Sequence, residues 1–281
     1  MSQEEPISKK TVLYDMPGAD AVTLQRDQPF GSSGDETLTL DLYHPANAAS
    51  SARLPAVVLV AGYPDQGFQR MLNCSFKDMG SSVSWARLIA ASGMIAITYT
   101  NREPIADAHT LLRSLHDNAP ALGIDETRIA LWASSGNVPL ALSLLTSAVK
   151  CAALCYGYTL DLDGFTEVAD AARTFKFANP CAGKSIADLP TDVPLFLARA
   201  GQDQTAGLNA SLDRFLGQAV TRNLPITFVN HPTAPHAFDL FDDSPTTREV
   251  VRRVLAFLRF HLLGWQEGAT SQALRGGTNA Q

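Results

Sequence analysis

The chain has 281 residues, of which 46% are hydrophobic and 18% are charged, and this composition is typical of a globular protein with a sizeable core. Its 22 basic and 28 acidic residues give a formal net charge of -6, so nucleic acid is not an expected partner. The longest apolar runs fall far short of the roughly 20 residues of a membrane-spanning helix. The polar N-terminus carries no secretory signal, which favours a cytoplasmic protein.

The first predicted element is an antiparallel strand over residues 37–43, where polar and apolar side chains alternate as in a half-buried strand. A cluster of Gly, Ser and Asp over residues 31–35 precedes it and predicts a turn. Residues 56–61 then form a continuous apolar run, and Gly62 follows it. Such a run is typical of a strand that is buried on both faces, so it predicts a parallel sheet.

From there, strand and helix patterns alternate along the chain. The predicted strands are 94–99, 128–133, 151–156, 193–200 and 226–230, and the predicted helices are 85–91, 105–115, 138–149, 208–220 and 246–263. This alternation predicts βαβ units and therefore an α/β fold, with a mostly parallel central sheet and helices on both faces.

One domain is expected to hold the whole chain, 1–281, with a core over about residues 37–263. The irregular stretch 157–189 is long for a connection between strands, and we expect it to form a small cap or a pocket wall. Residues 264–281 have little apolar content, so we expect a loose C-terminal tail.

A candidate nucleophile follows the strand 128–133. Residues 133–137 are Ala-Ser-Ser-Gly-Asn, which is similar to the G-x-S-x-G nucleophile elbow. We expect Ser135 to be the nucleophile, because the position two residues earlier must be small, and Ser134 would place a tryptophan there. Asn137 departs from the motif at its last position, although Asn tolerates unusual backbone angles. The alternative is that both serines cap the helix that follows.

A serine nucleophile needs a base, and the base needs an orienting carboxylate. Asp203 lies in the loop after the penultimate predicted strand and is the candidate acid, unless it only serves the start of the next helix. His236 lies several residues beyond the last strand and is the candidate base, whereas His231 at the strand edge is expected to be structural. A metal site of His231, His236 and Asp239 lacks a recognised ligand spacing, so neither a metal nor a cofactor is expected.

The order Ser135, Asp203, His236, each after a successive strand, resembles the α/β-hydrolase superfamily. Residues 132–136 and the His-Ala-Phe sequence at 236–238 look most like its dienelactone hydrolase-like members, although dienelactone hydrolases proper use a cysteine nucleophile. The resemblance covers roughly residues 37–263 and implies the α/β-hydrolase fold.

The resemblance also implies an oxyanion hole with two donors. One is the amide of Gly136, directly after the nucleophile. The other would come from the loop after the first buried strand, where Pro64 has no N–H, so the donor is Tyr63 through its amide or its phenol. The alternative is that Tyr63 only lines the pocket.

These expectations describe a serine hydrolase that cleaves a carboxylic ester, or a related acyl bond, of a small molecule through an acyl-enzyme. Two other functions remain open. One is a serine peptidase of the prolyl-oligopeptidase type, and the other is a non-catalytic binding protein that keeps the pocket. The sequence points to no particular oligomeric state.

Overall fold

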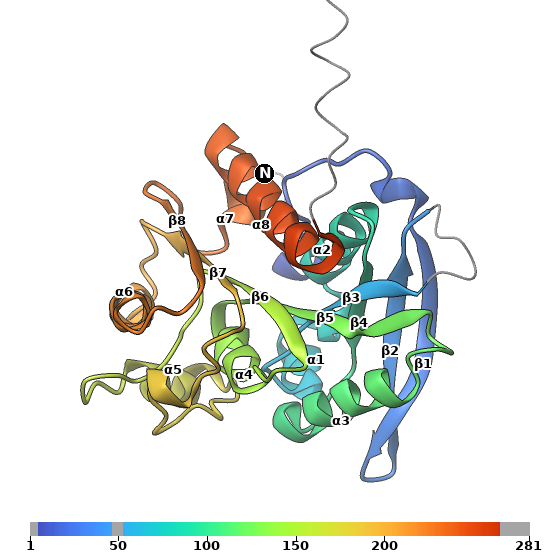
Figure 1. Ribbon diagram of the computed structural model, residues 1–281, viewed down its shortest axis with the longest axis horizontal. Helices are drawn as coiled ribbons and strands as arrows, with labels where there is room; N and C mark the ends of the chain where they lie inside the picture. The colour runs from blue at the N-terminus through green and yellow to red at the C-terminus, as the bar shows by residue number, and fades with distance from the viewer. Residues whose placement is uncertain (1–4, 47–52, 265–281) are drawn as a thin grey trace, which may run out of the picture.

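The computed structural model describes residues 5–46 and 53–264, whose strands form one twisted sheet (Figure 1). The order across the sheet is β1-β2-β4-β3-β5-β6-β7-β8. The strands are β1 (Thr23–Ser33), β2 (Glu36–His44), β3 (Leu54–Leu59), β4 (Ile95–Tyr99), β5 (Ile124–Ser134), β6 (Val149–Cys155), β7 (Leu195–Ala200) and β8 (Ile226–His231). β2 pairs antiparallel with β1 and with β4, and the other neighbouring strands are parallel. The expected mostly parallel sheet is therefore confirmed.

Helices cover both faces of this sheet. One face carries α2 (Gly80–Ala91) and α8 (Pro245–Leu263), and the other carries α3 (Pro104–Asp117), α4 (Val138–Ser143) and α6 (Leu208–Thr221) (Figure 1). Three further helices of the described chain are α1 (Asp65–Leu72), α5 (Glu167–Phe175) and α7 (Phe238–Phe241). Within the described residues, no helix is both long and apolar enough to cross a membrane.

The central strands are apolar because helices remove both of their faces from water. In β3 the side chains from Ala56 to Leu59 are at most 1% exposed. The apolar run at 56–61 is explained in this way, since an alternating pattern would place polar side chains against one of the two helix layers.

The register of the parallel strands brings their ends to one edge of the sheet. Leu59 pairs with Trp132 near the ends of β3 and β5, and Ala200 pairs with His231 at the ends of β7 and β8. The loops that follow these strands are therefore neighbours in space although they are far apart in sequence. Ligands of open α/β sheets bind at this edge.

Three local expectations need correction or fall outside the structure. β1 extends to Ser33, so the hairpin turn is confined to Gly34 and Asp35, and Gly34 has the positive φ of +60° that such a tight turn favours. The helix expected over 138–149 ends at Ser143, because the chain must turn back before β6 begins at Val149. Except for Gly264, the expected loose tail 264–281 lies outside the described residues.

Candidate active site

The turn between β5 and α4 holds the first candidate residue in a strained conformation. β5 ends at Ser134, which is extended, and Ser135 then has a φ of +54°, in the left-handed region that non-glycine residues rarely occupy. A single 3-10 turn, Ser135–Asn137, leads directly into α4. This sharp strand-to-helix turn is the geometry of a nucleophile elbow, and it selects Ser135 over Ser134 as the serine at its tip.

Ser135, His236 and Asp203 form one chain of hydrogen bonds. The Oγ atom of Ser135 lies 3.0 Å from Nε2 of His236, and Nδ1 of His236 lies 2.6 Å from Oδ2 of Asp203. When Nδ1–H donates to the carboxylate, Nε2 is left to accept the serine proton. The three residues predicted from separate loops are thus brought together in the order that nucleophilic catalysis requires.

The environment of Asp203 keeps its carboxyl ionised. Burial on its own would raise the pKa of Asp203, but hydrogen bonds from His236 and Thr205 outweigh burial and hold the pKa below its ordinary value. Oδ1 accepts the backbone N–H of Thr205 at 2.8 Å, in the loop before α6, while Oδ2 faces His236. One oxygen of Asp203 therefore accepts a hydrogen bond from the loop before α6, and the other accepts one from the histidine.

His231 and Asp239, the other two residues of the metal site considered above, have partners outside the candidate triad. His231 is buried, and its Nε2 lies 3.0 Å from the hydroxyl of Thr247 and 3.2 Å from a carboxylate oxygen of Asp242. Asp239 accepts hydrogen bonds from the Tyr156 hydroxyl and the Trp85 indole N–H, each at 2.7 Å.

These contacts give His231 the structural environment that its position at the strand edge predicts. Burial raises the pKa of Asp239. Both oxygens of Asp239 are engaged by donors from α2 and from the end of β6, so this carboxylate ties α7 to the sheet.

Asn137 connects the elbow to the loop after β3. Its Oδ1 accepts the backbone N–H of Gly62 at 2.7 Å, and its Nδ2 donates to the carbonyl oxygen of Ser134 at 3.1 Å. Gly62 fits closely here, since a Cβ on it would lie 3.0 Å from both the Cα of Asn137 and the carbonyl oxygen of Gly136. The departure from the elbow motif therefore supplies a tether that a glycine at position 137 would lack.

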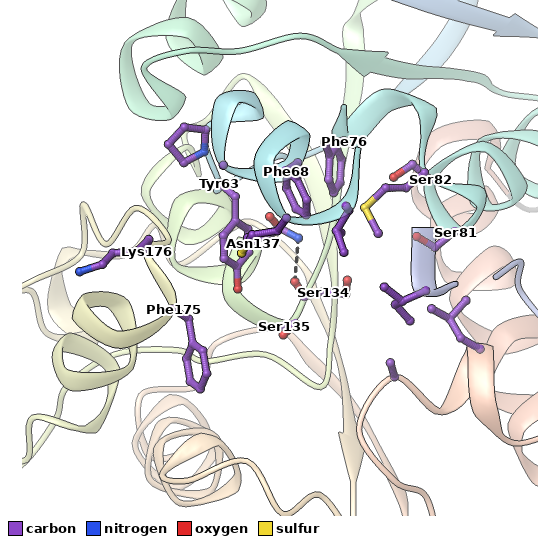
Figure 2. Close-up of a pocket in the computed structure, with 18 of the residues that line it drawn as sticks. Tyr63, Phe68, Phe76, Ser81, Ser82, Ser134, Ser135, Asn137, Phe175 and Lys176 are labelled. Carbon is purple, nitrogen blue, oxygen red and sulfur yellow. Dashed lines mark hydrogen bonds between the residues drawn. The ribbon is translucent and has the colours of Figure 1, made fainter. Parts of the chain in front are cut away.

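The phenol of Tyr63 lies against the backbone of Gly136. A Cβ on Gly136 would overlap the Tyr63 hydroxyl, and Figure 2 shows this hydroxyl directed toward Ser135. The tyrosine ring is held edge-on by Phe68 and Phe177, with centroid separations of 5.3 and 5.8 Å. Burial raises the pKa of Tyr63 to about 12, so its hydroxyl keeps its proton at neutral pH.

Ser135 and His236 open into a cavity of about 910 Å³, a volume typical of small-molecule sites. Its lining is largely apolar and comes from elements that are far apart in the chain. Its walls include α1, the start of α2, and α7, with Ile7 near the N-terminus. The stretch 157–189, expected to form a cap or a pocket wall, contributes Phe175 and Lys176.

Neither the protein-family models nor the sequences of curated proteins give a match to this chain. Solved structures do. A bacterial heroin esterase is 17% identical, with 89% of this chain and 87% of that chain covered and a TM-score of 0.67. A hyperthermophilic esterase from the archaeon Pyrobaculum calidifontis is 20% identical, with 84% and 85% covered and a TM-score of 0.65. A fungal esterase from Rhizomucor miehei is 16% identical, with 87% and 85% covered and a TM-score of 0.64.

These likenesses extend over most of both chains in each comparison. Together with the sheet described above, they confirm the expected α/β-hydrolase fold. At this level of sequence identity the comparison establishes the fold, and any activity must be argued from the residues of the site itself.

Proposed function

We propose that this protein is a serine hydrolase that cleaves a carboxylic ester through an acyl-enzyme intermediate. The observation that carries the proposal is the continuous hydrogen-bonded chain from Ser135 through His236 to Asp203, with Ser135 strained at the tip of an elbow and facing a cavity. Such an arrangement activates a hydroxyl that is otherwise a weak nucleophile at neutral pH.

In the first half of the reaction, Ser135 Oγ attacks the ester carbonyl carbon while Nε2 of His236 takes the hydroxyl proton. The carbonyl π electrons move to the oxygen, which becomes an oxyanion, and the carboxylate of Asp203 stabilises the imidazolium. When the tetrahedral intermediate collapses, the bond to the alcohol oxygen breaks and Nε2 returns the proton to that oxygen. A water molecule then repeats the same steps on the acyl-enzyme, which releases the acid and restores Ser135.

The oxyanion in this proposal receives hydrogen bonds from the Gly136 N–H and from the phenol of Tyr63. The amide of Gly62 is already donated to Asn137, so it is not the second donor. The hydroxyl of Tyr63 is placed beside Gly136 and is kept protonated by its raised pKa, which supports the phenol over the Tyr63 amide. Fixed donors of this kind stabilise the charge that develops in the transition state.

The esterase names of structural neighbours favour an ester over a peptide as the substrate, although the same geometry would serve acyl transfer from either. The dienelactone hydrolase-like subfamily and a cytoplasmic location stay predictions from the sequence. We also propose that residues 1–281 form a single domain with its core over about residues 37–263, because the candidate residues and the cavity lining come mainly from one sheet and its connections.

A fluorophosphonate probe tests the proposal directly, because it reacts only with an activated serine. We expect the wild-type protein and the Ser134→Ala variant to be labelled, with the label on Ser135 by peptide mass spectrometry, and the Ser135→Ala variant to stay unlabelled. Hydrolysis of a p-nitrophenyl ester should follow the same pattern. An unlabelled wild-type protein that hydrolyses no ester would favour the non-catalytic binding protein.

A further inference from the structure

The cavity continues past the candidate nucleophile to the start of α2. Ser81 and Ser82 line this end of the cavity. Figure 2 shows them on the side of Ser135 opposite to Phe175 and Lys176, with their hydroxyl oxygens turned toward the cavity. We call the end of the cavity that is lined by Ser81 and Ser82 the α2 end.

The first backbone N–H groups of α2 have no acceptor among the residues that the structure describes. Its N-cap residue, Met79, provides no side-chain hydrogen bond, and the first N–H that reaches back is that of Val83, to the Met79 carbonyl at 2.9 Å. Within residues 5–46 and 53–264, no acceptor is found for the amides of Gly80, Ser81 and Ser82. The start of a helix also carries a partial positive charge, so this end of α2 suits an acceptor group.

Two side chains of the cavity wall add donors that lack partners. Ser82 is only 2% exposed and lines the cavity, and no hydrogen bond joins its hydroxyl to a described residue. The indole N–H of Trp132 is buried without an acceptor in the same part of the chain, and Trp132 also lines the cavity. Asp239, which also lines the cavity, accepts hydrogen bonds from Trp85 and Tyr156 instead. A buried donor without an acceptor is unfavourable, so the Trp132 N–H indicates that something supplies an acceptor here, and the Ser82 hydroxyl faces the same cavity.

The position of His236 indicates which half of an ester would occupy the α2 end. His236 must give a proton to the departing alcohol, and its side chain is 34% exposed. His236 also borders an open groove, which Gln204 and Pro235 line as well. An alcohol that departs toward this groove leaves the α2 end to the acyl group. Apolar side chains that include Phe76, Met79 and Leu240 line the cavity and suit a hydrocarbon chain.

From these observations we propose that the α2 end is a subsite for an oxygen acceptor carried by the acyl group. The preferred substrates are then esters of oxo acids or dicarboxylic acids, whose carbonyl or carboxylate oxygen, remote from the scissile bond, accepts from Ser82 and from the first amides of α2. This inference rests on the proposed function and adds a substrate class to it. Backbone amides at a helix start commonly bind carboxylates and other oxygen acceptors.

The test uses p-nitrophenyl esters with the same chain length and different ends. They are the hexanoate, its analogue with a keto group on the carbon before the chain end, and the half ester of adipic acid, which ends in a carboxylate. We expect wild-type kcat/KM to be higher for at least one of the two acceptor-bearing esters than for the hexanoate. In Ser82→Ala the ratio of that kcat/KM to the hexanoate value should fall about tenfold, as the loss of a hydrogen bond to a buried group predicts.

Ser92→Ala is the matched control. Ser92 is a fully buried serine just beyond the other end of α2, where its hydroxyl bonds the Leu88 carbonyl, and it does not line the cavity. We expect this variant to leave the ratio between esters unchanged. Equal treatment of all three esters by the wild-type protein, or an unchanged ratio in Ser82→Ala, would overturn the subsite.

A binding experiment separates the subsite from the hydrolytic activity. The half adipate ester stays intact on a Ser135→Ala background, so calorimetry can compare its affinity with and without the additional Ser82→Ala change. We expect about tenfold weaker binding in the double variant. If the wild-type protein hydrolyses no ester, the proposed function fails, whereas equal binding by the two variants rejects the subsite alone.

Discussion

The candidate triad and the cavity walls lie side by side, but they are built in different ways. Ser135, Asp203 and His236 lie in the loops that follow β5, β7 and β8, so the register of the sheet sets their separations. Most of the wall comes from α1, the start of α2, α7, the stretch 157–189 and Ile7, none of which belongs to the sheet. Trp132 of β5 adds a contribution from the sheet. The sheet thus fixes the candidate reacting groups, while substrate selection depends on elements packed around the sheet.

The largest expected effect is on the reacting groups themselves. Ser135→Ala should lower kcat by about 10⁴-fold or more, because no other group can form the acyl-enzyme. Ser134→Ala keeps the nucleophile and should have a mild effect, which steady-state hydrolysis of a p-nitrophenyl ester will measure. A larger loss in Ser134→Ala than in Ser135→Ala would break the assignment of the elbow.

Asp203→Asn should lower kcat by about 10³- to 10⁴-fold, because an amide favours the wrong histidine tautomer. The lowered pKa of Asp203 means that its carboxylate is present above the ordinary carboxyl range and is lost only when the pH falls below that range. Protonation of Asp203 should therefore not lower the activity near neutral pH. An unperturbed circular dichroism spectrum checks the fold of the variant, and wild-type turnover in it would exclude Asp203 as the acid.

Tyr63→Phe should lower kcat by about 10²- to 10³-fold with little change in KM, since an oxyanion donor acts only as charge develops. The pKa of about 12 keeps the phenol protonated, so its contribution should persist until the pH approaches that value. Tyr158→Phe is the control, because that hydroxyl bonds the Ala206 carbonyl instead. Turnover in Tyr63→Phe equal to that of the control would leave the amide of Tyr63 as the donor.

The sequence predicts a residue's place in the fold where a short stretch of neighbouring residues determines it. A strand buried on both faces leaves a continuous apolar run, and the residue that follows it lies at the ligand-binding edge whatever the rest of the chain does. This is why the strands and the order of Ser135, Asp203 and His236 follow from the sequence, and why Ser135 could be chosen over its neighbour.

The rest depends on contacts between distant segments. α1 spans only 8 residues, so its three apolar side chains, Phe68, Met71 and Leu72, are too few to predict a helix. The bond between Asn137 and Gly62 joins residues 75 positions apart, and no pattern near either one predicts it. Asn137 was visible in the sequence only as a departure from a motif, and that departure is the signal that could have pointed to a contact of its own.

Asn137→Gly restores the residue usual for an elbow and should still lower kcat, by about tenfold, because the loop that carries Tyr63 loses its tether to the elbow. If the tether acts through Tyr63, the loss should be smaller on a Tyr63→Phe background than in the wild-type protein. A double-mutant cycle on kcat measures this coupling. Strictly additive losses would mean that Asn137 stabilises the elbow without positioning the oxyanion donor.

Substitutions in the cavity wall should have the smallest effect on the kinetic constants. Met71 on α1 lines the cavity and is 67% exposed, so its removal should weaken contact with a long acyl chain without moving any reacting group. Met71→Ala should raise KM for a long-chain p-nitrophenyl ester by about two- to fivefold, as the loss of a partial apolar contact predicts, and should leave kcat close to the wild-type value. Val220→Ala, a similarly exposed apolar position on α6 outside the cavity, should change neither constant. A fall in kcat in Met71→Ala would mean that the wall takes part in positioning the reacting groups, and the division between sheet and walls would then fail.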